Sequence, residues 1–161
     1  MNLRLRLLGR VGLGTMARVL SWWPPYIGAG VSIRATDDHT IEVRMPLRWY
    51  NRNVVGTHFG GSLYAMCDPF FMMILLRHLG PDYVVWDKAA TVRFRRPGRG
   101  LVRARFHVPP ATVAEIRARA DGEPKVEPQF TAQVVAEDGT VVAEVEKLLY
   151  VRRRVPAAAA A

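Results

Sequence analysis

Cysteine and lysine are almost absent from this sequence, and both scarcities limit what the protein can be. The single cysteine, Cys67, excludes an intramolecular disulfide and is compatible with a reducing compartment. Only three of the 23 basic residues are lysines, so the net charge of +9 comes mostly from arginine. This charge permits a nucleic acid, an anionic surface or a phosphorylated ligand as partner without selecting one of them.

The sequence also lacks a hydrophobic run that could cross a membrane. Its most apolar stretch, residues 70–76, is far shorter than the roughly 20 residues that a transmembrane helix needs. Arg10 and Arg18 interrupt the N-terminal segment, and no small-residue cleavage site follows it. We therefore expect a cytoplasmic protein without membrane contact, whose N-terminal segment belongs to the mature chain.

Half of the 161 residues are hydrophobic, which is enough to build one well-packed core and too little chain for two comfortable domains. An amphipathic pattern predicts a helix over residues 3–23, ended by Pro24 and Pro25. We expect this helix and a connector over residues 1–27, one domain over 28–152 and a disordered tail over 153–161.

Alternation of apolar and polar residues predicts six strands. Two short runs, 31–35 and 41–45, flank a turn at Asp37 and Asp38 and indicate a hairpin. Four longer runs follow over 84–96, 100–108, 126–137 and 140–152, with a short helix over 112–120 between the second and third of them.

Residues 60–79 interrupt this alternation and leave no polar face, which is typical of a buried helix. The order of elements therefore predicts an α+β fold, in which a curved six-stranded antiparallel sheet wraps around one long central apolar helix. An exposed edge of such a sheet invites pairing with a second copy of the chain.

One motif lies in the loop before this helix and in the helix itself. The spacing of five residues matches that of a known family; they are Asn53, Gly56, Gly60, Gly61 and Asp68. In this respect the sequence resembles the hotdog-fold acyl-CoA thioesterases of the phenylacetate-degradation type. The resemblance covers residues 28–152 and is closest to an uncharacterised branch of that superfamily. It implies a hotdog fold, a homodimer or dimer of dimers, and hydrolysis of an acyl thioester at the dimer interface.

The resemblance also implies roles for individual residues. Asp68 would be the general base or nucleophile, Asn53 would orient water or the carbonyl, and the backbone N–H groups of Gly60 and Gly61 would hold the oxyanion. The family's histidine position is occupied here by Phe59, and His58 stands one residue earlier. We expect His58 either to replace the missing imidazole or to be a hydrogen-bonding loop residue.

A second set of residues is expected to bind the substrate. We expect the acyl chain to lie along Phe59, Tyr64, Met66 and Phe70. Basic residues at one strand end would meet the phosphates of coenzyme A or form a solvated strand face; they are Arg93, Arg95 and Arg96. Coenzyme A is part of the substrate, so we expect no cofactor. The four histidines show no ligand spacing, and we expect no metal.

Several alternatives remain open. Asp68 followed by Pro69 is also a good helix start, in which Asp68 would cap a helix beginning at Pro69. Cys67 is more simply a small buried residue than a nucleophile, and Gly12-Leu13-Gly14 only mimics a dinucleotide-binding turn. The chain could also bind acyl-CoA or a lipid-like ligand without catalysis. Only its charge favours nucleic acid, which we do not expect as a partner.

Overall fold

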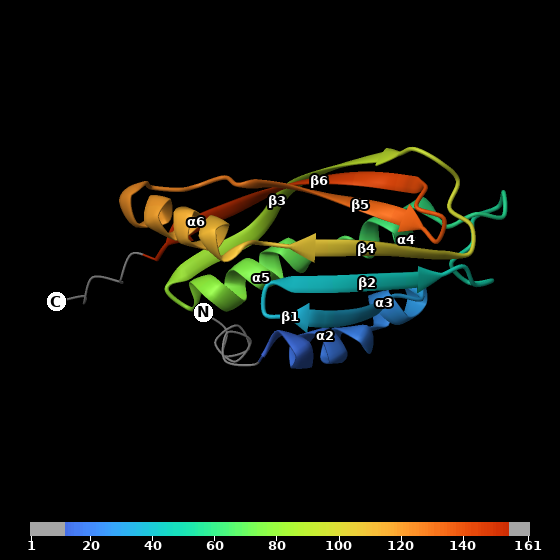
Figure 1. Ribbon diagram of the computed structural model, residues 1–161, viewed down its shortest axis with the longest axis horizontal. Coiled ribbons are helices and arrows are strands. Elements are labelled where there is room, and N and C mark those ends of the chain that lie inside the picture. Colours follow the sequence, from blue (N-terminus) through green and yellow to red (C-terminus); the bar gives the residue numbers. More distant parts are fainter. Residues whose placement is uncertain (1–11, 155–161) are drawn as a thin grey trace.

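The computed structural model describes residues 12–154. Residues 1–11 of the predicted N-terminal segment, and the predicted tail from residue 155 onward, lie outside the described residues. One antiparallel sheet holds six strands in the order β1-β2-β4-β5-β6-β3 (Figure 1). The strands are β1 (Ser32–Asp37), β2 (Thr40–Pro46), β3 (Tyr83–Phe94), β4 (Leu101–His107), β5 (Gln129–Ala136) and β6 (Val141–Arg153).

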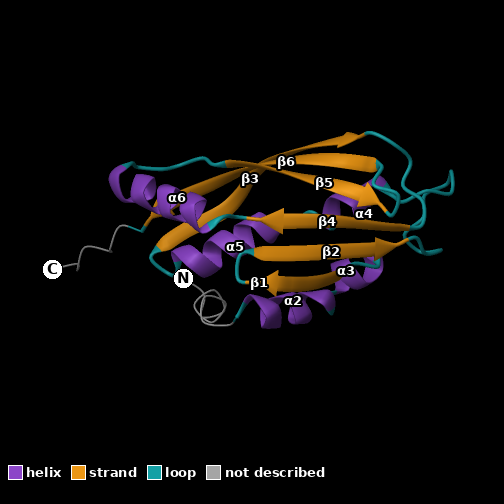
Figure 2. Cartoon of the chain, in the orientation of Figure 1, coloured by secondary structure: helices purple, strands orange, loops and turns teal. Residues whose placement is uncertain are grey.

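Helices lie along one edge, across one face and at one end of this sheet (Figure 2). The first two follow the β1 edge, α4 and α5 lie across one face, and α6 connects β4 to β5. The bounds are α2 (Leu13–Ser21), α3 (Pro24–Ala29), α4 (Gly60–Ala65), α5 (Phe70–Leu79) and α6 (Pro110–Gly122). The predicted α+β architecture is therefore confirmed, including each of the six strands and the short helix before β5.

The central helical segment differs from the prediction of one continuous helix. It consists of α4 and α5, which are separated by Met66–Pro69, and the Asp68–Pro69 peptide bond is cis. Pro69 occupies the position before α5 and no side chain caps that helix. The alternative of a separate helix starting at Pro69 is therefore confirmed to within one residue. Asp68 does not cap that helix, because Pro69 holds the N-cap position and the Asp68 carboxylate pairs with Lys147.

The prolines predicted to end the first helix do more than end it. Described residues place α2 at Leu13–Ser21, and Pro24 and Pro25 then begin the short helix α3. Proline is suited to the first helical turn because its missing N–H has no partner there in any case. Gly30 ends α3 in a left-handed conformation, with φ of 73°.

Aromatic side chains of α5 fill the core between the helix and the sheet. Phe106 of β4 contacts both Phe70 and Phe71, with ring centroids 5.0 and 5.2 Å apart. Phe71 also stacks on Phe130 of β5 at 4.8 Å. These contacts bury the apolar helix against the middle of the sheet and fix where α5 begins.

Within residues 12–154, no helix combines the length and the apolar character that a membrane crossing requires.

Candidate functional site

Asn53 organises the loop that carries the motif. Its Oδ1 accepts hydrogen bonds from the backbone N–H groups of Val55 and Thr57, at 3.1 and 3.0 Å. Its Nδ2 donates to Thr57 Oγ1 at 2.9 Å and to the His58 carbonyl at 3.3 Å. The side-chain amide is therefore committed to the fold of a tight loop, as in an Asx-type turn.

Asn51 anchors the same loop to the rest of the protein. Its buried Nδ2 donates to the carbonyls of Ala29 and Pro46 at 2.8 and 3.0 Å, and its Oδ1 accepts from the Arg48 N–H at 2.7 Å. The amide thus joins α3, the end of β2 and the loop at a single point. The sequence motif begins only at Asn53 and does not indicate this role of Asn51.

His58 points inward, and Phe59 points outward. The His58 side chain is buried, its Nε2 donates to the Gly100 carbonyl at 3.0 Å, and its Nδ1 is buried without a partner. Burial lowers the pKa of His58, which favours the neutral imidazole. Phe59 remains 55% exposed. The one-residue shift in the motif therefore places the imidazole against the β3–β4 connection, as a loop hydrogen-bonding residue.

The two glycines begin α4, and aromatic rings pass close to both. A side chain at Gly60 would bring its Cβ within 3.0 Å of the Phe94 ring, and one at Gly61 would collide with the Phe59 ring. No side chain caps α4. The glycines thus allow these rings a close approach that no other residue permits, besides leaving the first backbone N–H groups of the helix without a capping side chain.

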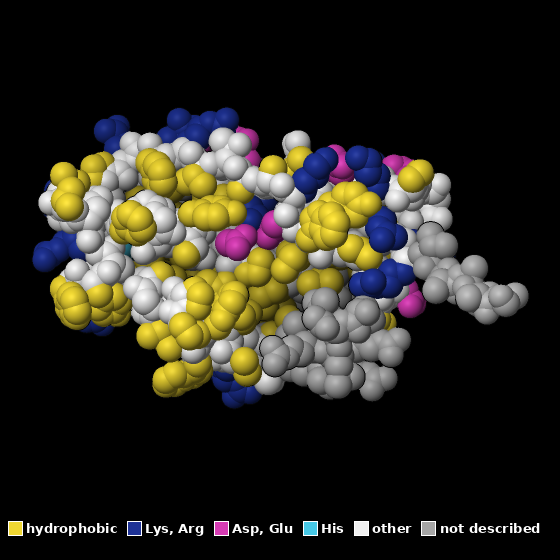
Figure 3. Space-filling view, turned by 180° about the vertical axis from the view of Figure 1, so that it is seen from behind, with side chains coloured by type: hydrophobic (Ala, Val, Ile, Leu, Met, Phe, Trp, Pro, Cys, Tyr) yellow, Lys and Arg dark blue, Asp and Glu magenta, His cyan; other side chains and the backbone are white. Residues whose placement is uncertain are grey.

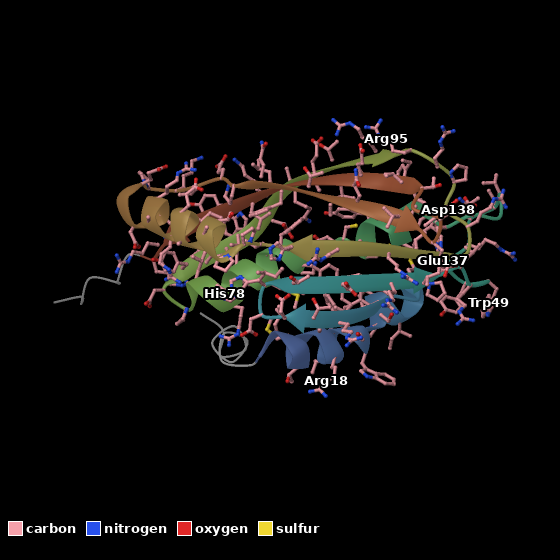
Figure 4. The ribbon with its side chains drawn as sticks, in the orientation of Figure 1. Arg18, Trp49, His78, Arg95, Glu137 and Asp138 are labelled. Carbon is pink, nitrogen blue, oxygen red and sulfur yellow. The ribbon has the colours of Figure 1, made fainter. Side chains whose placement is uncertain are left out.

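Two of the three predicted phosphate-binding arginines are already paired. Arg93 forms an ion pair with Glu146, and Arg95 Nε donates to Glu144 Oε2 at 2.8 Å. Arg95 lies at the end of β3 on the outside of the sheet (Figure 4). Among the described residues, Arg96 has no acidic partner. It is therefore the predicted arginine that keeps its charge available to a ligand.

The motif loop, the start of α4 and the β3–β4 connection enclose an open pocket of about 500 Å³, which we call the loop pocket. Five of the predicted site residues line it and are thus brought together: Asn53, His58, Gly60, Arg95 and Arg96. Asp68 is not part of that lining.

Asp68 lies in the break between α4 and α5, with 41% of its side chain exposed. Its Oδ1 accepts a hydrogen bond from Lys147 Nζ at 2.5 Å. Lys147 comes from β6 and its side chain is 1% exposed. The carboxylate is thus open to solvent on one side and in contact with a buried ammonium group on the other.

Lys147 also reaches a second carboxylate and a phenol. Its Nζ lies 3.2 Å from Asp87 Oδ2, and it donates to the Tyr64 hydroxyl at 3.3 Å. We call Asp68, Asp87 and Lys147 the acid–lysine cluster. The ammonium group of Lys147 is therefore shared by two carboxyl groups, and the Tyr64 hydroxyl lies beside them.

The protonation of the cluster follows from its burial and its charges. Burial raises the pKa of Asp87 to about 6, although the charge of Lys147 and its hydrogen bond oppose this change. Burial alone would lower the pKa of Lys147, but the two aspartates outweigh it and the pKa of Lys147 is raised. Lys147 is therefore cationic at neutral pH, whereas Asp87 changes charge in the mildly acidic range.

The groups around the cluster are not reactive. Burial raises the pKa of the Cys67 thiol to about 12, so the reading of Cys67 as a small buried residue fits its environment. Tyr26 of α3 donates from its hydroxyl to the Asp68 carbonyl at 2.5 Å, which fixes the backbone at the helix break. Burial raises the pKa of Tyr26, and so its phenol stays protonated.

Two of the residues expected to contact the acyl chain are inaccessible. Met66 and Phe70 are fully buried in the core, and we remove them from the candidate substrate surface. Tyr64 is partly buried beside Lys147, and Phe59 is exposed. Phe94 is 59% exposed and lies against Gly60, so it joins Phe59 on that surface. Figure 3 shows a broad hydrophobic area on this molecule with acidic side chains inside it.

Lys147 and Asp87 were not predicted as site residues, although each occupies an apolar position in the alternation of its strand. Lys147 has the same inward phase on β6 as Val145 and Leu149, and Asp87 has the phase of Val85 on β3. A charge in the apolar phase of a strand is costly unless it is paired. Two such charges on neighbouring strands therefore indicate a buried ionic cluster.

Residues 12–154 contain no group of three or more histidine, cysteine, aspartate or glutamate side chains arranged to hold a metal ion. In the acid–lysine cluster, the Lys147 ammonium group contacts both carboxylates.

Solved structures similar to this chain share its whole fold. A Pseudomonas aeruginosa protein of unknown function, described as a probable thioesterase, is 23% identical with a TM-score of 0.71, over 94% of this chain and 95% of its own. A thioesterase from Haemophilus influenzae is 16% identical with a TM-score of 0.64, over 89% and 92%. The PaaI protein of the phenylacetic acid degradation operon of E. coli is 18% identical with a TM-score of 0.61, over 94% and 96%.

These similarities confirm the predicted hotdog fold. No relative is found among curated proteins. A family model described as a domain of unknown function matches residues 15–151, which is most of the chain. The chain therefore belongs to the family of this domain of unknown function, DUF4442.

Proposed function

We propose that the protein is an acyl-CoA thioesterase, which hydrolyses an acyl thioester to a free acid and coenzyme A. The observation that carries the proposal is the Asp68 carboxylate. It is partly exposed at a break in the central helical segment and is held through one oxygen by a buried lysine. A carboxylate fixed in this way can take a proton from water while remaining accessible to a substrate.

The reaction follows from this arrangement. Asp68 takes a proton from water, and the hydroxide oxygen bonds to the thioester carbonyl carbon. The backbone N–H groups at Gly60 and Gly61 donate hydrogen bonds to the resulting oxyanion. The C–S bond then breaks, and the thiolate of coenzyme A recovers the proton from Asp68. In the alternative covalent route, the Asp68 carboxylate attacks the carbonyl carbon, the C–S bond breaks and the thiolate of coenzyme A leaves. Water then hydrolyses the mixed anhydride to the free acid and the Asp68 carboxylate, and the proton that this step releases protonates the thiolate.

A second copy of the chain is part of the proposal. Asp68 does not line the loop pocket of its own protomer, so one chain does not bring the acid and the glycines around one cavity. β3 is the last strand of the sheet, and its far edge has no partner in residues 12–154. We propose that two copies meet along this edge, where the exposed Phe59 and Phe94 are also placed to be covered.

Coenzyme A would enter by the loop pocket. Arg96 and Arg99 line it, and neither has an acidic partner among the described residues. Their guanidinium groups can bind the phosphates of the nucleotide end. Phe59 and Phe94 would then contact the acyl or pantetheine part of the substrate. A panel of acyl-CoA substrates would determine which acyl chain length the protein prefers.

The test is release of free thiol from a panel of acyl-CoA substrates. We expect the wild-type protein to release thiol and the Asp68→Asn variant to lose about 10²- to 10⁴-fold in kcat, the range attributed to general acid–base catalysis. Asp38→Asn is the matched control, because this exposed aspartate lies in the β1–β2 turn outside the site. We expect it to keep wild-type activity. Equal activity of the wild type and Asp68→Asn would remove Asp68 from the mechanism.

A non-catalytic function has one specific observation in its favour. The amide of Asn53 and the imidazole of His58, both expected in catalysis, are committed to backbone and loop hydrogen bonds. A binding module for acyl-CoA or a lipid-like ligand would need neither group free. A rise in the thermal midpoint with acyl-CoA, without thiol release by the wild type, would support this function and reject the hydrolase.

A further inference from the structure

Lys147 is the least expected charge in the described part of the molecule. It projects from β6 into the interior, at a position flanked on its own strand by Val145 and Leu149, both fully buried. Holding an ammonium group in such a place costs several kcal/mol unless strong partners compensate. Both partners are aspartates, and one of them is the acid that the proposed reaction uses.

The three charges of the cluster come from three separate segments. Asp68 belongs to the break between α4 and α5, Asp87 to β3 and Lys147 to β6. Lys147 Nζ lies 2.5 Å from Asp68 Oδ1 and 3.2 Å from Asp87 Oδ2, so both carboxylates contact the same ammonium group. The contact to Asp68 is the shorter one.

The two carboxylates differ in their exposure. The side chain of Asp68 is 41% exposed, whereas that of Asp87 is 18% exposed and its Oδ1 is buried without a partner. Asp87 therefore faces the interior and Asp68 faces the surface. A substrate or water can reach Asp68, and Asp87 influences it through the shared Lys147, through its own charge and through a side-chain interaction between the two carboxyl groups.

We propose that Lys147 is a positioning residue, which fixes the Asp68 carboxylate for reaction, and that Asp87 tunes this hold by competing for the same ammonium group. The inference rests on the proposed function for its catalytic consequence. The sharing of Lys147 between the two aspartates can be tested without any activity.

No other charge faces the cluster among the described residues. The remaining titratable neighbours are Tyr26 from α3, Tyr64 from α4 and Cys67 from the helix break, and the raised pKa values of Tyr26 and Cys67 keep both protonated. Tyr64 accepts a hydrogen bond from Lys147, and its ring centre lies 5.2 Å from Nζ. Only the two aspartates and the lysine therefore set the charge of the cluster near neutral pH.

Competition for one cation has consequences of opposite sign. Without Lys147, the Asp68 carboxylate loses both its counterion and the group that fixes its position. Without the charge of Asp87, Lys147 serves Asp68 alone and its hold on that carboxylate strengthens. A purely structural ion cluster would lose stability in both cases and would show no such opposition.

The kinetic test compares kcat and KM of the cluster variants for one acyl-CoA substrate. We expect Lys147→Met to lower kcat by about tenfold or more with little change in KM, and Asp87→Asn to keep or raise kcat. Lys147→Arg retains the charge and should keep most of the wild-type kcat. Lys125→Met is the matched control, because this exposed lysine pairs with Glu127 outside the site. An unchanged kcat in Lys147→Met, or an equal loss in Asp87→Asn, would overturn the proposal.

The second test needs no turnover and measures the titration of Asp87 by carboxyl carbon-13 NMR, assigned with Asp87→Asn. In the wild-type protein we expect a midpoint near pH 6, in line with the raised pKa of Asp87. Asp68→Asn should lower this midpoint, and Lys147→Met should raise it, each by about one unit. Should Lys147→Met not fold, Lys147→Arg and Asp68→Asn still decide the outcome.

The two tests distinguish failure of the proposed thioesterase function from failure of the shared-lysine proposal. A coupled Asp87 titration in a protein that hydrolyses no acyl-CoA would reject the thioesterase and support the shared lysine. An Asp87 midpoint that is indifferent to Asp68→Asn would reject the shared lysine, even in an active thioesterase.

Discussion

The loop pocket and the acid–lysine cluster use polar groups in opposite ways. In the loop pocket, the amides of Asn51 and Asn53 satisfy backbone groups, and the His58 imidazole stays neutral and buried. In the cluster, charged groups meet in a mostly apolar interior and one of them keeps much of its surface exposed. The polar atoms of the first region hold the chain in shape, whereas the second region leaves one carboxylate open to solvent.

This difference shows how a motif can mislead about its own chemistry. Asn53 and His58 occur in a sequence pattern associated with catalysis, yet their hydrogen bonds explain their presence through folding alone. Asp68 belongs to the same pattern but has no structural task at the helix start. Its partner Lys147 lies 79 residues away in the sequence and outside the motif.

The largest effect on stability is expected in the loop region. Asn51→Ala removes three hydrogen bonds and leaves the carbonyls of Ala29 and Pro46 and the N–H of Arg48 without that partner. Since unpaired buried polar groups are costly, we expect a loss of about 3 kcal/mol in the free energy of unfolding, measured by denaturant titration. The neighbouring Trp49→Ala, which removes a mostly exposed ring, is the control and should cost far less. A loss below about 0.5 kcal/mol in Asn51→Ala would mean that water replaces these bonds.

A smaller and pH-dependent effect is expected in the cluster. Well below pH 3.8, Asp87 is protonated in both the folded and the unfolded chain. Between about pH 4 and 6 the unfolded chain releases this proton first, because the folded pKa is raised to about 6 from 3.8, and the wild type therefore loses stability as pH rises. Asp87→Asn lacks this loss. We expect it to gain about 2 kcal/mol relative to the wild type between pH 4 and pH 7.

Denaturant titrations at both pH values measure this gain, and the exposed Asp82→Asn variant serves as the control. A difference between Asp87→Asn and the wild type that stays constant with pH would show that Asp87 ionises alike in both states. The contrast between the two regions would then be weaker than the geometry indicates.

The smallest effect is expected on the outside of the sheet. Arg93 and Glu146 form a close ion pair, but both side chains are about half exposed. Exposed pairs contribute little because solvent screens them. We expect Glu146→Gln to change the free energy of unfolding by less than about 0.5 kcal/mol, measured as for the other variants. A larger loss would mean that surface charges on β3 and β6 matter as much as the buried cluster.

Most of the architecture could be predicted because it follows from periodicity. The alternation in 140–152 and the unbroken apolar character of 70–76 each allow one structural reading, and β6 and α5 confirm them. The break at Met66–Pro69 could be predicted only as one of two alternatives, because an Asp-Pro pair fits a capped helix start as well as a kink in one long helix. The bond from Tyr26 to the Asp68 carbonyl depends on tertiary contacts that no local pattern reveals.

The candidate site was predictable only where the motif is local in sequence. The spacing brought Asn53, His58 and Gly60 to one pocket, as expected, but gave no indication that hydrogen bonds within the loop occupy their polar atoms. Lys147 was missed because a charge in an alternating strand is normally assigned to the solvated face. Only its phase relative to Val145 and Leu149 distinguishes it.

The packing of Phe59 against Gly61 carries an evolutionary consequence. A methyl group at position 61 would collide with the ring of residue 59, and because this ring is exposed it would have to turn aside. Alanine at 61 would therefore change the direction in which that ring points. Related sequences with alanine at 61 should favour a smaller side chain at 59, and this preference would be visible as covariation between the two positions.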